Sequence, residues 1–110
     1  MEYVQNNPNE VYIVGHVLRD AEVRKTNKGC PLCQFVLSYT YRWKGKVRTF
    51  FFDVVQFGQE AAEGAVQLKK GVDVEVWGRL EQSVWKDKEG QVRNRTKIVA
   101  TRIEVRDVRV

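Results

Sequence analysis

Histidine is almost absent from this sequence, and the short motifs of the commonest catalytic sites are missing. His16 is the single histidine, and the chain has neither a Gly-x-Ser-x-Gly turn nor a glycine-rich phosphate-binding loop. Asp53 could serve as an acid, but it lies within an expected strand, where a neighbouring Arg or Lys is the better explanation for it. We therefore expect no enzymatic activity, no catalytic residue and no cofactor.

Cysteine is equally scarce, with only Cys30 and Cys33 in a Cys-Pro-Leu-Cys sequence. A zinc site needs about four ligands, and His16 is the only other plausible soft ligand in the chain. A redox pair would place its first thiol at a helix N-terminus, whereas residues 34–37 have the composition of a strand. We interpret the two cysteines as reduced thiols at the entry to a strand and expect no metal. The alternative is a metal or disulfide that bridges two subunits.

Long apolar runs are also missing. No segment approaches the ~20 apolar residues that cross a bilayer, and residues 1–10 lack the basic start and apolar stretch of a secretory signal. We expect a cytoplasmic protein without membrane contact, and flexible residues 1–10.

What the chain does contain is enough apolar sequence for one core and an excess of positive charge. Hydrophobic residues make up 43% of the 110 residues and charged residues 30%, which suits a single globular domain over residues 1–110. The 19 Lys and Arg outnumber the 14 Asp and Glu, for a net charge of +5. This balance favours an anionic partner without identifying it.

The pattern of β-branched and alternating residues predicts five strands and one short helix. The strands are expected at residues 11–18, 32–43, 47–57, 73–80 and 92–105. The helix is expected over residues 58–68, which are rich in helix formers. We expect Gly15 to mark a bulge or sharp bend, and Leu80 to face the core with Val74 and Val76.

This order of three strands, a helix and two strands is the layout of the OB-fold. That all-β fold is a five-stranded Greek-key barrel that binds oligonucleotides or oligosaccharides. The third strand is unusual for a barrel because Phe50, Phe51 and Phe52 make both of its faces apolar. Either a neighbouring subunit covers the outer face, or some of these rings remain open for stacking.

Two tryptophans lie in basic segments at expected turns, a combination that suits single-stranded nucleic acid. Trp43 and Trp85 can stack on unpaired bases, while Trp77 lies within a strand and is expected to be structural or interfacial. The surrounding cations are expected to contact phosphates: Arg42, Lys44, Lys46, Arg48, Lys86, Lys88, Arg93 and Arg95. We expect them to line one groove shared by both tryptophans. The competing interpretation is a barrel that binds protein or sugar, which would not need cations at both hairpins.

The chain resembles the bacterial single-stranded DNA-binding protein family over residues 11 to 106. The matching blocks are residues 14–24, 26–29, 52–58, 68–71, 76–80 and 85–90. The resemblance implies that Trp43, Phe51, Phe57 and Trp85 stack on bases. It also implies a homotetramer that acts in DNA replication, recombination and repair, and thus a protein associated with the nucleoid.

Two features depart from that family. Its glycine-rich extension with an acidic tip, which recruits other enzymes, is not expected here because Val110 ends the domain. Residues 29–37 instead resemble primosomal replication protein N, a tailless dimeric relative. That resemblance implies a subunit of the replication-restart primosome with a replication-restart helicase as partner. A chain trimmed to its DNA-binding domain is a third interpretation, and the choice between dimer and tetramer stays open.

Overall fold

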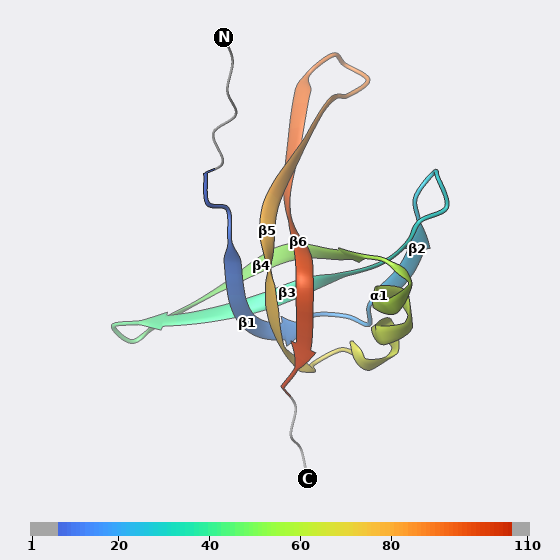
Figure 1. The fold of residues 1–110 in the computed structure, drawn as a ribbon. Coiled ribbons are helices and arrows are strands. Elements are labelled where there is room, and N and C mark those ends of the chain that lie inside the picture. Colours follow the sequence, from blue (N-terminus) through green and yellow to red (C-terminus); the bar gives the residue numbers. More distant parts are fainter. Residues whose placement is uncertain (1–6, 107–110) are drawn as a thin grey trace.

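The computed structural model describes residues 7–106, which form a closed five-stranded barrel with one short helix (Figure 1). In chain order the elements are β1 (Val11–Val17), β2 (Glu22–Lys25), β3 (Pro31–Trp43), β4 (Lys46–Phe57), α1 (Gln59–Gly64), the 3-10 helix η1 (Ala65–Gln67), β5 (Asp73–Lys86) and β6 (Val92–Val105). The predicted OB-fold is confirmed, with its helix between the third and fourth barrel strands. The flexibility predicted for residues 1–10 falls mostly on residues 1–6, which lie outside the described residues, as do residues 107–110.

The strand order is β1-β5-β6-β4-β3-β2, and an additional β1–β3 pairing closes the barrel. All neighbouring strands are antiparallel except β4 and β6, which pair in parallel from Asp53 to Val55. β1 pairs with β5 along most of its length, but it reaches β3 only through His16 and Val17. The barrel is therefore closed by one short pairing at the end of its first strand.

Two glycines permit the close strand contacts. Of the bulge or sharp bend expected at Gly15, the bulge is not found, because β1 pairs with β5 in regular register through Gly15. A register irregularity lies instead between Trp77 and Gly78 in β5. A Cβ at Gly15 would lie 2.4 Å from the carbonyl oxygen of Ser38, and a Cβ at Gly78 would lie 2.2 Å from that of Val99. Gly15 thus allows β1 to approach β3 where the barrel closes, because no side chain separates the two backbones.

The core fills the barrel and the space under the helix. Leu37, Val74 and Val76 are fully buried, and the alternation in β5 predicted this for Val74 and Val76. The helix α1 and the turn η1 contribute Ala61 and Ala65, and Leu68 follows them into the same cluster. The two alanines are small, so they let the short helix and the turn lie close to the barrel.

One strand was missed by the sequence analysis. β2 pairs with β3 outside the closed barrel, from Glu22 opposite Gln34 to Lys25 opposite Pro31. All four of its residues are exposed and three are charged, so it buries no apolar face. A strand of this kind leaves no alternation in the sequence, because only its backbone pairing holds it in place.

The prediction for Leu80 was wrong. Leu80 pairs with the buried Ile98, yet 46% of its surface is exposed. The reason is that the pairing of β1 with β5 ends with Val11 opposite Gly78, while β5 continues to Lys86 rather than ending near residue 80. The side chain of Asn9 bonds both the N–H and the carbonyl of Leu80, at 2.9 Å each.

Two hairpins extend from the barrel in different directions (Figure 1). One is formed by β3 and β4, and the other by β5 and β6. In the first, Lys44 and Gly45 form the turn between Trp43 and Lys46, and both have positive φ. Such a turn matches the right-handed twist of the flanking strands. The two hairpins carry most of the predicted binding residues.

Candidate functional site

The core-side face of the β3–β4 hairpin continues beyond the barrel as an exposed aromatic and cationic surface. Tyr41, Trp43, Lys46, Arg48 and Phe50 line a hollow of about 280 Å³ there. The Trp43 ring is 59% exposed, and the Lys44 ammonium lies 5.6 Å from its centroid. The structure therefore brings Trp43 together with three of the predicted phosphate-binding cations, Lys44, Lys46 and Arg48, and it adds two aromatic rings that the predicted set did not include.

The opposite face of β4 carries the other predicted aromatic residues of this hairpin. Phe51 is 59% exposed and Phe57 is 44% exposed. Phe52 packs against the core instead, and Phe50 stacks on Tyr39 with ring centroids 6.3 Å apart. The structure thus shows which phenylalanine of residues 50–52 lies on the outer face: Phe51 faces outward, away from Trp43. Arg42, which pairs with Val47, lies on the same outer face.

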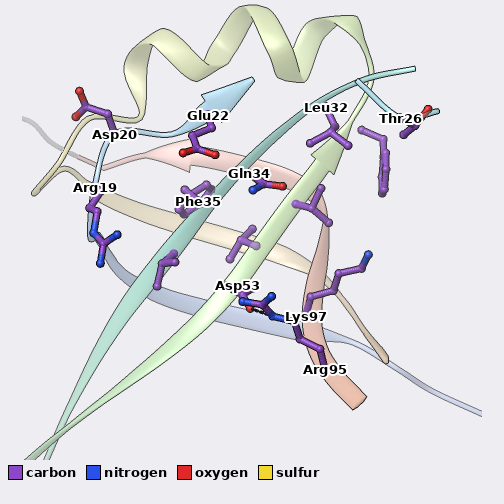
Figure 2. Close-up of a pocket in the computed structure, with 14 residues that line it drawn as sticks. Arg19, Asp20, Glu22, Thr26, Leu32, Gln34, Phe35, Asp53, Arg95 and Lys97 are labelled. Carbon is purple, nitrogen blue, oxygen red and sulfur yellow. Dashed lines mark hydrogen bonds and ion pairs between the residues drawn. The ribbon is translucent and has the colours of Figure 1, made fainter. Parts of the chain in front are cut away.

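A groove of about 560 Å³ lies on this outer face, beside β2 and β6 (Figure 2). Apolar side chains form much of its surface, including Leu32, Val55 and Phe57. Six charged side chains also line it: Arg19, Asp20, Glu22, Asp53, Arg95 and Lys97. The groove thus combines an aromatic ring, an apolar surface and charges of both signs.

An ion pair crosses the groove between β4 and β6. Asp53 Oδ2 accepts a hydrogen bond from Arg95 Nε at 2.9 Å, as Figure 2 shows. The parallel register places Asp53 opposite Lys97, so Arg95 lies two residues along β6 on the same face. The expectation that Asp53 pairs with a cation is confirmed, and that cation is one of the predicted phosphate-binding residues.

The β5–β6 hairpin carries Trp85, which is 46% exposed and lies opposite Arg93. Asp87 organises the turn: its carboxylate accepts hydrogen bonds from the N–H groups of Glu89 and Gln91 and from Arg93 Nε, each at 2.9 Å. The hydrogen bond from Arg93 is the largest cause that lowers the pKa of Asp87 below its usual value. This network holds the hairpin turn and the guanidinium of Arg93 in one arrangement.

The tryptophans do not share a groove within one chain. Trp43 lines the hollow on the β3–β4 hairpin, whereas Trp85 lies on the other hairpin and lines neither of the two hollows described. By alternation, Trp85, Arg93 and Arg95 share the face of β6 that carries Lys97. The predicted residues therefore form two surfaces, one with Trp43 and one with Phe51, Phe57, Arg95 and Trp85.

Among residues 7–106, the predicted cations differ in whether they have an anionic partner. Arg93 and Arg95 are ion-paired. The other six are exposed and make no ion pair with a described residue: Arg42, Lys44, Lys46, Arg48, Lys86 and Lys88. These six are free to meet an external anion.

Two groove cations, Arg19 and Lys97, were not among the predicted site residues. Lys97 continues the alternation of Arg93 and Arg95 along β6. The two-residue period of a strand could therefore have identified Lys97 as a third cation on the same face. Arg19 lies in the connection after β1. Its place in the groove depends on the tertiary fold, which the local sequence does not indicate.

Trp77 has a different environment from the other two tryptophans. Its ring lies 5.1 Å from that of Tyr12 and 4.6 Å from the guanidinium of Arg102. It lies in the ladder of β1, β5 and β6, opposite Tyr12 and Arg102, and its structural or interfacial role stays a prediction.

The remaining chemistry-bearing residues are dispersed. Within the part of the chain that the structure describes, no three His, Cys, Asp or Glu residues gather as metal ligands would. Cys30 is exposed and Cys33 is buried, neither is in a disulfide, and burial raises the pKa of the Cys33 thiol. No helix among the described residues is long and apolar enough to span a bilayer.

Comparison with known proteins gives consistent similarities. The model of the Single-strand binding protein family matches residues 8–106. A "Single-stranded DNA-binding protein" of Treponema pallidum (strain Nichols) is 37% identical over 103 residues, which cover 88% of this chain and 57% of that protein. One of Aquifex aeolicus (strain VF5) is 33% identical over 102 residues, covering 88% and 69%. The chain thus spans little more than half of the Treponema relative.

A solved structure has the same fold. The chain described as "Plasmodium falciparum SSB complex with ssDNA" superimposes with a TM-score of 0.85 at 21% identity. The superposition covers 96% of this chain and all of the other.

Proposed function

Because this chain belongs to the single-strand binding protein family, we propose that it binds single-stranded DNA without sequence preference. The observation that carries the proposal is the exposure of Trp43, Phe51, Phe57 and Trp85 on a cationic barrel. An unpaired base has an open π face that can stack on such a ring, whatever the base is. The curated relatives that match are named for the same activity.

Binding in this proposal combines two contributions. Bases stack on the four aromatic residues, and the exposed cations of the two hairpins neutralise phosphates. Neutralisation releases counterions, so the affinity should fall with salt at a slope of about −0.7 per phosphate contacted. Duplex DNA should bind poorly, because paired and stacked bases hide the faces that the rings need. The role is one of binding without catalysis, in the cytoplasm and on the nucleoid, during replication, recombination and repair.

Intrinsic fluorescence tests this function directly. A titration with oligothymidylate should quench the emission of Trp43 and Trp85, and an equal concentration of duplex should not. Variants that each keep one tryptophan, with phenylalanine at the other two positions, assign the quenching, and Trp77 serves as the internal control because it packs against Tyr12 and Arg102. Absence of quenching and of binding at low salt would refute the proposal.

We further propose that copies of the chain assemble. β1 pairs with β3 only at His16 and Val17, so the edge of residues 11–14 that faces away from β5 has no partner strand among the described residues. Tyr12 on this strand is 57% exposed. Light scattering measures the number of copies. Four would support general coating of single strands, while two would support the primosomal alternative and direct the search for a partner to a replication-restart helicase.

A further inference from the structure

The outer groove contains equal numbers of acids and bases, which is unexpected for a surface proposed to bind phosphates. Asp20, Glu22 and Asp53 line it together with Arg19, Arg95 and Lys97. The partners of these three acids decide what each acid does to the groove.

Two of the acids pair with residues outside the groove lining. Glu22 Oε1 accepts hydrogen bonds from Arg24, at 2.9 Å to Nη2. Asp20 accepts a hydrogen bond from the backbone N–H of Lys70 at 2.9 Å and so ties the β1–β2 connection to the segment after η1. Neither acid cancels the charge of a groove cation through a direct bond.

Asp53 differs because its partner is a groove cation. Among the described residues, the one hydrogen bond that its side chain makes comes from Arg95. It bonds no backbone group, in contrast to Asp87, which holds the turn of the β5–β6 hairpin. Both side chains of the pair remain open to solvent, with 38% of Asp53 and 70% of Arg95 exposed. A neutral side chain of the same shape at position 53 should therefore preserve the fold.

We propose that Asp53 competes with a DNA phosphate for the guanidinium of Arg95, and that this competition sets the affinity for single-stranded DNA. This inference rests on the proposed function. The carboxylate occupies the Nε edge of the guanidinium and leaves only the outer nitrogens for a phosphate. A phosphate bound there lies within a few ångströms of Asp53, well inside the Debye length of about 10 Å at 0.1 M salt. The repulsion is therefore not screened.

The opposing effect is orientation, because Asp53 also holds Arg95 in place. An exposed ion pair restrains an arginine only weakly, and such pairs contribute little to stability. Repulsion between two anions that share one guanidinium exceeds that benefit. The charge of Asp53 consequently lowers the affinity.

The test compares four variants by titration of a fluorescent oligothymidylate at several salt concentrations. Asp53→Asn keeps the shape of the side chain and removes its charge. It should bind about three- to tenfold more tightly, with a salt slope steeper by up to about 0.7. The matched control is Glu104→Gln, which removes one carboxylate paired with Arg102 outside the groove. It should change affinity by less than about twofold.

The double variant Asp53→Asn/Arg95→Gln removes both charges of the pair, so the net charge of the groove does not change. Because the inference holds that Asp53 keeps Arg95 from contributing much to binding, this variant should weaken binding less than Lys97→Gln, which removes one cation on the same strand and in the same groove.

Three results would overturn the inference: weaker binding by Asp53→Asn, a gain no larger than that of Glu104→Gln, or a larger loss with the double variant Asp53→Asn/Arg95→Gln than with Lys97→Gln. Failure of the wild-type protein to bind oligothymidylate would instead refute the proposed function itself.

Discussion

Replacing both Trp43 and Trp85 by alanine should weaken single-strand binding by the sum of the two separate losses. The two rings lie on hairpins that leave the barrel in different directions (Figure 1), and Trp85 does not line the hollow that Trp43 lines. Substitutions at such independent positions add. One stacked base contributes about 1–3 kcal/mol. The double variant should therefore lose about 2–6 kcal/mol, which is roughly 30-fold to 10⁴-fold in affinity.

The assay is fluorescence anisotropy with a labelled oligothymidylate of about 16 nucleotides, the upper end of the site size for one OB-fold. Salt is held constant, because phosphate contacts vary with it. Both rings are exposed, so the variants should keep the wild-type circular dichroism spectrum. Trp77→Phe is the matched control: it removes a tryptophan packed between Tyr12 and Arg102 and should bind as the wild type does.

One result would refute the reasoning outright, namely a double variant with wild-type affinity. If the double variant loses no more affinity than the single variant with the larger loss, the rings contact the same base. The two-surface description of the site would then be wrong.

Three further predictions concern stability and reactivity. Gly78→Ala should lower the free energy of unfolding by about 2 kcal/mol or more, measured in urea, because the new Cβ would lie 2.2 Å from a backbone oxygen of β6; Gly64→Ala, with nothing within 4 Å, is the control and should not destabilise. Asp87 has a lowered pKa, so its contribution to stability is present at neutral pH and is lost as the pH falls below about 4. Amide protection factors, which compare exchange with the intrinsic rate at the same pH, should fall in acid for the β5–β6 hairpin alone, and unchanged protection there would contradict the prediction. An alkylating reagent should label the exposed Cys30 and spare the buried Cys33 until the protein unfolds, as mass spectrometry can measure; equal labelling of both in the folded state would contradict the burial.

The sequence was sufficient for the barrel strands because their alternation reflects one buried face. Val74 and Val76 are buried where the period predicted. β2 escaped detection because its pairing with β3 uses backbone groups and leaves its charged side chains in solvent. Leu80 was misplaced because the end of the barrel depends on where β1 stops, which the sequence of β5 does not record.

The exposure of the candidate site residues was predictable from the sequence, but their arrangement was not. Exposed aromatic residues were expected at the two hairpins and on the third barrel strand, and Trp43, Phe51 and Trp85 are exposed there. The division into two surfaces follows from the directions in which the hairpins project, a property of the whole fold. The same holds for Arg19 and for the pairing of Arg95 with Asp53, since both depend on chain segments far apart in sequence.

The short parallel contact between β4 and β6 is one of two places where the two halves of the barrel join. The long β3–β4 and β5–β6 ladders pair directly where Asp53 to Val55 lie opposite Lys97 to Val99, and β1 links them again because it pairs with both β5 and β3. With two joints, the bases of the two hairpins are held in one relative position. A flexible polymer that reached both the surface with Trp43 and the surface with Trp85 would therefore have to adapt its path to the protein.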